Sequence, residues 1–249
     1  MNHIKNLELL EFTVFNGNLN DLSLVNFSDK EKVVINTINP HSYCISKVDA
    51  NFKHSLKSSD VLIPDGSGIV LAARVLLNKK IDKITGPDLH EHLLNDLNKT
   101  KGSCFYMGSS DATLDLIRDK IKKDYSSITV EVYSPPYKEK LSDSDNKEII
   151  KQINIFSPDV LFVGMTAPKQ EKWLEENKDK LNFGIASCVG AAFDWYAGVN
   201  KPPSRISKKL HLAWLERFFK EPIRMTPRIK SMLYFLYVIA MKKIKMFVR

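Results

Sequence analysis

The sequence predicts an α/β protein: a mainly parallel, Rossmann-like sheet with helices on both faces, followed by a basic, largely helical C-terminal appendage. Two observations carry this fold class. Short apolar runs alternate with helix-patterned segments along most of the chain, as in parallel sheets that are buried on both faces. Near Gly198 the alternation stops, and prolines and basic residues follow. We therefore expect an α/β body at residues 1–200 and a helical appendage at residues 201–249.

The expected strands are apolar stretches bounded by turn-forming residues. Residues 4–15 predict a strand or hairpin at an edge. The buried strands follow at Lys32–Asn39, Val61–Ile63, Ser103–Gly108, Ile128–Tyr133, Asp159–Gly164 and Asn182–Cys188. Helical patterning covers residues 41–56, 69–77, 87–98, 112–123 and 145–156 and resumes at Pro168. The crossovers between parallel strands should be right-handed.

Composition and missing motifs exclude several classes of protein. Cys44, Cys104 and Cys188 are far apart and lack metal-type spacing, which fits a reducing cytoplasm without disulfides. The N-terminal residues include acids and no long apolar run, so we expect no signal peptide. No G-x-G-x-x-G, P-loop or G-x-S-x-G motif occurs, so dinucleotide and ATP binding lack their fingerprint. We expect no cofactor.

The net charge of +8 is unevenly distributed along the chain. Residues 200–249 carry 13 Lys and Arg and two acids, a net charge of +11, whereas residues 1–199 carry a net charge of −3. A nearly neutral body thus ends in a strongly basic tail. Such asymmetry indicates an anionic partner, which is a lipid surface, a phosphorylated substrate or a nucleic acid.

The tail combines its basic residues with apolar ones. Lys208–Lys220 mixes Trp, Phe and Leu with Lys and Arg, and Met232–Met241 is uninterruptedly apolar before Lys242 and Lys243. That run is about half of the ~20 residues that a membrane span needs. Composition and length favour a helix that lies in the interface of an anionic membrane. The alternatives are a core helix or a helix that forms a homo-oligomer, and nucleic acid is a weaker rival.

The first candidate site is the turn in Val61–Val70, VLIPDGSGIV. A strand, a Gly-containing turn and a helix together present backbone N–H groups and one polar side chain at the carboxyl edge of a sheet. A carboxylate there would repel a bare phosphate, so Asp65 is a candidate base for a hydroxyl, and Gly66 is a candidate substrate contact. Pro-Asp-Gly is also good turn chemistry, which on this segment alone is the simpler explanation.

Three further stretches supply candidate substrate-binding residues. Thr37 and Asn39 end a strand and should emerge at the same edge as Asp65. Gln170 follows another strand in GMTAPKQEKW, where a capped helix with its charged residues in solvent is the alternative. Asp194 lies in VGAAFDWYAG, whose small residues permit close approach of a ligand to the backbone. A semi-buried Asp more often caps a helix or pairs with an arginine.

Two charged groups bear on phosphate and metal binding. Arg217, Arg224 and Arg228 lie on the proline-bounded appendage, and arginine forks suit a diphosphate, where they can replace a metal ion. Contact with lipid phosphates is the alternative for them. Asp143-Ser144-Asp145 is a D-x-D sequence, but it opens a predicted helix, so we interpret it as a helix cap and expect no metal site.

Assembled in order, these stretches resemble the WecG/TagA/CpsF family of bacterial glycosyltransferases. Each motif alone is weak, whereas seven in family order across about 190 residues are specific. They are TIN at Thr37–Asn39, PDGSGIV at Pro64–Val70, ITGPDL at Ile84–Leu89, FYMGSS at Phe105–Ser110, APKQEKW at Ala167–Trp173, VGAAFDWYAG at Val189–Gly198 and WLERFFKEPIRMTPR at Trp214–Arg228.

The resemblance implies a metal-independent, inverting transferase. Such an enzyme moves a sugar, often of N-acetylmannosamine type, from a UDP donor to an undecaprenyl-diphosphate-linked sugar at the cytoplasmic face of the membrane, in synthesis of a surface polysaccharide. Asp65 would be the general base, and Thr37, Asn39 and Gln170 would line the substrate pocket. The three arginines of the appendage would bind the diphosphate of UDP.

Some positions depart from the family pattern. Lys201-Pro202-Pro203 stands where Arg-Ala-Pro is common, and His211-Leu212-Ala213 stands where Gly-Leu-Glu is frequent. These departures bear on donor choice more than on the chemistry. Two other functions remain open: a membrane-tethered nucleotide-sugar sensor or scaffold without turnover, and a nucleic-acid-binding module driven by the basic tail.

Overall fold

Parallel strands form the centre of the molecule. The computed structural model describes residues 4–27, 32–190, 192–200 and 222–248, together with residues 207, 216, 218 and 219. Within these residues, six strands pair in the order β4-β3-β8-β7-β5-β6, all parallel. They are β3 (Val33–Ile38), β4 (Val61–Pro64), β5 (Ser103–Gly108), β6 (Thr129–Tyr133), β7 (Val160–Gly164) and β8 (Ile185–Cys188). The fold class predicted from the sequence is confirmed.

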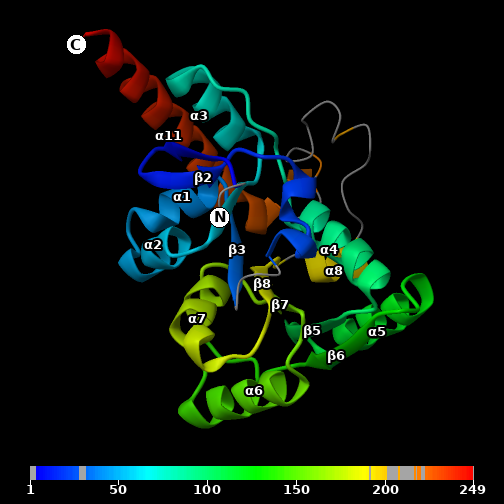
Figure 1. The fold of residues 1–249 in the computed structure, drawn as a ribbon. Coiled ribbons are helices and arrows are strands. Elements are labelled where there is room, and N and C mark those ends of the chain that lie inside the picture. The colour runs from blue at the N-terminus through cyan, green and yellow to red at the C-terminus, as the bar shows by residue number, and fades with distance from the viewer. Residues whose placement is uncertain are drawn as a thin grey trace.

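Helices cover both faces of this sheet (Figure 1). One face packs against α4 (Gly86–Thr100), α5 (Asp111–Asp124) and α8 (Ala192–Ala197), with the short helices η1 (Leu19–Leu22) and η2 (Leu24–Phe27). The other face packs against α6 (Asp143–Phe156) and α7 (Lys169–Asn177), which continues into η3 (Lys178–Lys180). The central strands β3, β7 and β8 are buried on both sides, which explains their largely apolar sequences.

A third apolar cluster lies beside the edge strand β4. The N-terminal residues form an antiparallel hairpin of β1 (Asn6–Leu9) and β2 (Phe12–Phe15), a separate sheet that packs near β4. Helices α1 (Pro40–Ser46), α2 (Ala50–Lys57) and α3 (Ser67–Leu77) complete the cluster. The single helix expected over residues 41–56 is wrong, because Asp49 accepts a hydrogen bond from Phe52 N–H and begins α2 as a new helix.

The helix α11 (Pro222–Phe247) joins the same cluster from the C-terminal end of the chain. Phe235 and Ile239 are buried, and the ring of Phe235 meets Tyr43 of α1 edge to face at 5.0 Å. Figure 1 shows α11 running along α3 and past α1. Gly68 of α3 makes this approach possible, since a Cβ there would lie 2.4 Å from Pro40 Cγ and 3.3 Å from Met232 Sδ.

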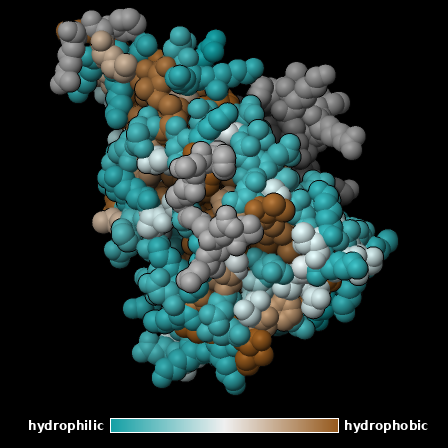
Figure 2. Space-filling model, in the orientation of Figure 1, coloured by the Kyte–Doolittle hydropathy of each residue, from teal (hydrophilic) through white to brown (hydrophobic). Residues whose placement is uncertain are grey.

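The opposite side of α11 leaves apolar side chains exposed (Figure 2). Leu233, Tyr237 and Ile244 are each more than half exposed, and Lys242, Lys243 and Lys245 follow along the helix. Among the described helices, none is both long and apolar enough to cross a membrane. The helix is therefore an amphipathic element with one face on the body of the protein.

Candidate active site

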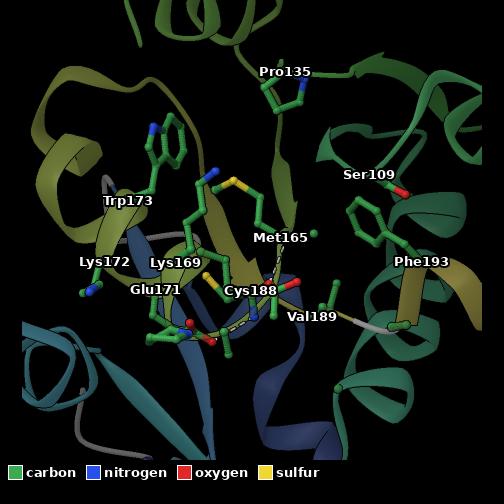
Figure 3. A pocket seen from close by; sticks show the side chains of 18 of the residues that line it. Ser109, Pro135, Met165, Lys169, Glu171, Lys172, Trp173, Cys188, Val189 and Phe193 are labelled. Atoms are coloured by element: carbon green, nitrogen blue, oxygen red, sulfur yellow. Dashed lines mark hydrogen bonds between the residues drawn. The ribbon is translucent and has the colours of Figure 1, made fainter. Parts of the chain in front are cut away.

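A pocket of about 1670 Å³ lies at the carboxyl ends of the parallel strands. This is the edge at which open α/β sheets bind ligands, because chain connections leave it in opposite directions. The segment after every strand of the six-stranded sheet lines it: Asn39 after β3, Asp65 after β4, Ser109 after β5, Ser134 after β6, Met165 after β7 and Gly190 after β8. Thr37, near the end of β3 itself, also lines it. Figure 3 shows Lys169, Glu171 and Trp173 of α7 on one side of the pocket and Ser109 and Phe193 on the other.

The ends of β3 and β4 form one wall of the pocket, which we call the β3–β4 wall (Thr37, Asn39 and Asp65). The two strands are neighbours in register, with Thr37 beside Ile63, and Asp65 N–H donates to Ile38 O at 2.8 Å. The three side chains predicted to meet at this edge therefore do so, and Asp65 is half-buried. The carboxylate of Asp65 therefore lines the pocket, and the hydrogen bond to Ile38 holds its backbone in place.

Local backbone chemistry sets the shape of this wall. Asn39 Oδ1 accepts hydrogen bonds from the N–H groups of His41 and Ser42, each at 3.0 Å, and so begins α1. Gly66 directly precedes α3 and has a φ of +88°, a conformation that favours glycine. Gly66 is not among the residues that line the pocket. Its observed role is to turn the chain after Asp65.

Arg228 brings a cation from α11 to the pocket. His41 Nδ1 lies 2.9 Å from Ser231 Oγ, and Cys44 Sγ lies 3.4 Å from Ser231 O, so α11 is fastened to α1 one turn from Arg228. Burial lowers the pKa of His41, and the positive charge of Arg228 lowers it further. The arginine therefore lies near the start of α1, on the side of the pocket that carries Asp65.

The start of α7 and the adjacent end of β8 form a second wall, which we call the α7 wall (Gln170, Glu171 and Cys188). Gln170 and Glu171 are each only 4% exposed. Gln170 Oε1 accepts from Met165 N–H at 3.1 Å, and Gln170 Nε2 donates to Glu171 Oε1 at 2.8 Å. Burial raises the pKa of Glu171 to about 7. The alternative that placed Glu171 in solvent is wrong.

A lysine-rich loop closes the pocket on the third side. Residues 134–141, between β6 and α6, line it almost continuously, and Ser134 Oγ donates to Ser109 O at 3.0 Å. Lys138 pairs with Asp145 at 2.8 Å, and Lys169 of α7 donates to Lys138 O. This loop is therefore tied both to the β5–α5 turn and to α7.

Comparison with known proteins places these residues in a family. The profile of the glycosyl transferase WecG/TagA/CpsF family matches residues 8–247, almost the whole chain. The chain belongs to this family. It is a glycosyltransferase, and the pocket at the carboxyl edge of its sheet is the candidate active site.

Several curated relatives share most of the length of this glycosyltransferase. A protein of Bacillus subtilis (strain 168) is 28% identical over 92% of this chain and 90% of its own. Relatives from Staphylococcus aureus (strain MW2) and Bacillus spizizenii are 25% and 26% identical, over 84% and 76% of this chain and 80% and 71% of their own. All three are named N-acetylglucosaminyldiphosphoundecaprenol N-acetyl-beta-D-mannosaminyltransferase.

The D-x-D sequence of the glycosyltransferase begins a helix, as we expected. Ser142 and Asp145 form a capping box at the start of α6, and hydrogen bonds from Lys138 and Ser142 lower the pKa of Asp145 to about 2. His90 is buried against Tyr106, with Nε2 2.6 Å from the hydroxyl oxygen. Over the described parts of the chain, no group of three His, Cys, Asp or Glu side chains is placed to hold a metal ion.

Six of the nine site residues predicted from the sequence line the same pocket: Thr37, Asn39, Asp65, Gln170, Asp194 and Arg228. Arg217 lies outside the described residues, as does the side chain of Arg224, although its helix is described. Glu171 and the loop at residues 134–141 were not predicted from the sequence to line the site. Helical spacing was an available signal for Glu171, since it precedes the buried Leu174 by three positions and so shares its face.

Proposed function

We propose that this glycosyltransferase is inverting and metal-independent, and that it transfers a sugar of N-acetylmannosamine type from a UDP donor to an undecaprenyl-diphosphate-linked saccharide. The observation that carries the proposal is that a carboxylate, Asp65, and a cation, Arg228, line the same pocket. The names of the relatives support the choice of sugar and of a lipid-linked acceptor. The reaction belongs to the synthesis of a cell-envelope polysaccharide.

Asp65 acts as the general base in this proposal. Its carboxylate accepts the proton of an acceptor hydroxyl while the hydroxyl oxygen forms a bond to the anomeric carbon of the donor sugar. The bond between that carbon and the β-phosphate oxygen breaks, and UDP leaves with the electron pair. Attack from the face opposite the leaving group inverts the configuration. Positioned base catalysis of this kind contributes typically ~10²–10⁴-fold to the rate.

Arg228 meets the charge that develops on the leaving diphosphate. Arginine presents several N–H donors in a planar fork and stays protonated, so it stabilises a diphosphate without a metal ion. We assign the same role to Arg217 and Arg224, which the sequence places on the same appendage. A preorganised cation close to a developing negative charge is worth a few kcal/mol of barrier.

The dimensions of the pocket suit two substrates. A volume of about 1670 Å³ exceeds the ~300–1,000 Å³ that is usual for one small ligand. We place the sugar nucleotide and the terminal sugar of the acceptor in it together, with Thr37, Asn39, Gln170 and Asp194 as substrate contacts. Asp65 has to lie between the two sugars, because it accepts the proton from the acceptor hydroxyl that attacks the donor sugar.

The appendage brings the enzyme to the membrane. The exposed apolar side chains of α11 and its terminal lysines are the pattern of a helix that lies in the interface of an anionic bilayer. A lipid-linked acceptor would then reach the pocket from the side of α11, which also carries Arg228. The proposal therefore has the protein at the inner face of the cell membrane as a peripheral enzyme.

The test is UDP release from a panel of UDP-sugars in EDTA, with and without a short-chain lipid-diphosphate-GlcNAc acceptor. We expect release that depends on the acceptor and is fastest with a UDP-N-acetylmannosamine donor, with inversion at the anomeric carbon shown by NMR of the product. Tight UDP binding without release from any donor would instead indicate a sensor. Absence of both UDP binding and release would contradict the proposal altogether.

A further inference from the structure

Two consecutive polar side chains are buried at the start of α7, where solvent exposure is the usual outcome for such residues. Gln170 and Glu171 are each 4% exposed, and both line the pocket. Helix α7 begins after Pro168 without a side-chain cap. These two side chains form part of the α7 wall of the site, and the hydrogen bond between them needs an explanation.

The Gln170 amide is held by hydrogen bonds at both of its ends. Met165 N–H donates to Oε1 at 3.1 Å, and Nε2 donates to Glu171 Oε1 at 2.8 Å. The oxygen and nitrogen of an amide have nearly the same shape, so only such partners decide which way it faces. A Cβ at Gly190 would lie 3.5 Å from both Nε2 and Oε1. The amide thus packs against the turn after β8. The two hydrogen bonds leave one N–H and one lone pair of the amide for a ligand.

Glu171 makes this contact at a cost in stability. Its second oxygen, Oε2, is buried and has no hydrogen-bond partner among the residues described, and a buried unsatisfied group costs about 1–3 kcal/mol. Its neighbour Cys188 is a buried thiol, whose pKa is raised by burial and by the charge of Glu171. A leucine or methionine would fill the same space without the cost. The other side-chain oxygen, Oε1, accepts the hydrogen bond from Gln170, and this contact is where we look for the contribution of Glu171.

We propose that Glu171 is a positioning residue, whose carboxyl oxygen fixes the orientation of the Gln170 amide so that Gln170 presents its free N–H to a substrate. The inference rests on the proposed function for its substrate, a sugar nucleotide or lipid-linked sugar. Figure 3 shows Glu171 beside Cys188 below Met165, on the α7 side of the pocket. Glu171 acts through Gln170 and does not itself touch the reacting atoms.

A double-mutant cycle tests this coupling. Glu171→Leu should raise the KM of the substrate that Gln170 contacts about ten-fold, the value of one lost hydrogen bond, with kcat within about two-fold. In a Gln170→Leu background the same change should have no further effect on KM. Glu171→Gln keeps an acceptor oxygen and should restore most of the lost affinity. The matched control is Glu175→Leu, which removes another acid of α7, one that pairs with Lys178 of η3.

Additive effects of the two substitutions, or equal loss in Glu171→Gln and Glu171→Leu, would overturn the proposal. Hydrogen exchange of the Gln170 side-chain amide, read by NMR and assigned with Gln170→Leu, keeps the test independent of turnover. We expect slow exchange in the wild type and in Glu171→Gln, and fast exchange in Glu171→Leu. Fast exchange in the wild type overturns the contact itself. Slow exchange in a protein that transfers no sugar would leave the contact intact and refute only the proposed function.

Discussion

The two walls of the pocket hold polar groups in opposite ways. On the β3–β4 wall, Asn39 satisfies its side-chain oxygen with two backbone N–H groups, and Asp65 follows a strand whose backbone pairs with β3 and remains half-buried. On the α7 wall, Glu171 is almost completely buried and one of its oxygens has no partner in the described structure. The β3–β4 wall keeps its polar side chains partly exposed, at little cost in stability. The α7 wall buries its carboxyl group, at a considerable cost in stability.

This difference separates two kinds of contribution to a site. A half-exposed carboxylate keeps part of its hydration until a substrate arrives, so replacing it should change the reaction and leave the fold intact. A buried carboxylate weakens the fold at neutral pH, because burial disfavours its charged form. Replacing it should therefore change stability as well as binding. Four sets of substitutions test this contrast, beginning with the largest expected effect.

Replacing the carboxylate of the β3–β4 wall should lower the activity of the enzyme and leave its stability unchanged. Asp65→Asn removes the proposed base while preserving the shape of the side chain, so turnover should fall about 10²–10⁴-fold while the melting temperature stays unchanged. Asp82→Asn, in the exposed loop before α4, is the matched control for loss of one carboxylate. Turnover of Asp65→Asn near that of the control would remove Asp65 from this role.

Arg228 of α11 lines the pocket on the same side as the β3–β4 wall. Replacing it should also lower activity and leave stability unchanged. Arg228→Gln should lower turnover about 10²-fold, as expected when one preorganised donor to a developing charge is removed. The substitution should also raise the pKa of His41, which the arginine charge now helps to lower, and NMR titration measures this. Lys230→Gln, which removes an exposed cation two positions further along the helix, is the control, assayed with a short-chain acceptor. A fall in turnover without a change at His41 would contradict the placement of Arg228.

The sequence predicted the β3–β4 wall but only part of the α7 wall, and the interactions that form each wall explain the difference. Thr37, Asn39 and Asp65 are polar residues at the ends of apolar strands, and neighbouring parallel strands must end at the same edge. The strand pattern therefore predicted that these side chains share an edge, although turn chemistry remained the simpler explanation for Asp65 on its own segment. The one helix expected over residues 41–56 became α1 and α2, since the capping strength of Asp49 depends on a backbone turn that periodicity does not show.

The α7 wall depended on contacts between segments distant in sequence. Glu171 is buried because α7 packs on the sheet beside Cys188, and the Gln170 amide is fixed by Met165 and by the turn at Gly190, which follows a different strand. A single charged residue at the start of a helix is normally solvated, so the local sequence favoured a solvent-exposed Glu171. The loop at residues 134–141 was also missed, because Pro and Lys indicate a loop without showing that it folds over a pocket.

The charge of Glu171 should make stability depend on pH. Its pKa is raised from 4.5 to about 7 in the folded protein. Between these values the unfolded chain loses the proton while the folded protein keeps it, so the free energy of unfolding falls as pH rises from 4.5 to 7. Glu171→Gln lacks this loss and should be more stable than the wild type above pH 7, by a few kcal/mol at most. Urea unfolding at several pH values measures the difference, which should vanish below pH 4.5. A difference that does not change with pH would contradict the buried, neutral carboxyl.

The smallest effect separates the two functions of Asn39. Asn39→Ala removes the cap of α1 and should lower stability by about 1 kcal/mol, whereas Asn39→Asp, an equally good cap, should keep it. The carboxylate introduced by Asn39→Asp would repel a diphosphate in the pocket, so UDP affinity should fall although stability does not. Ser142→Ala, which removes the cap of α6 outside the pocket, is the control and should lower stability alone. Calorimetry of unfolding and of UDP binding gives both quantities. Equal UDP affinity in Asn39→Asp and the wild type would mean that Asn39 serves the helix and not the substrate, and the β3–β4 wall would then present only Thr37 and Asp65 to the ligand.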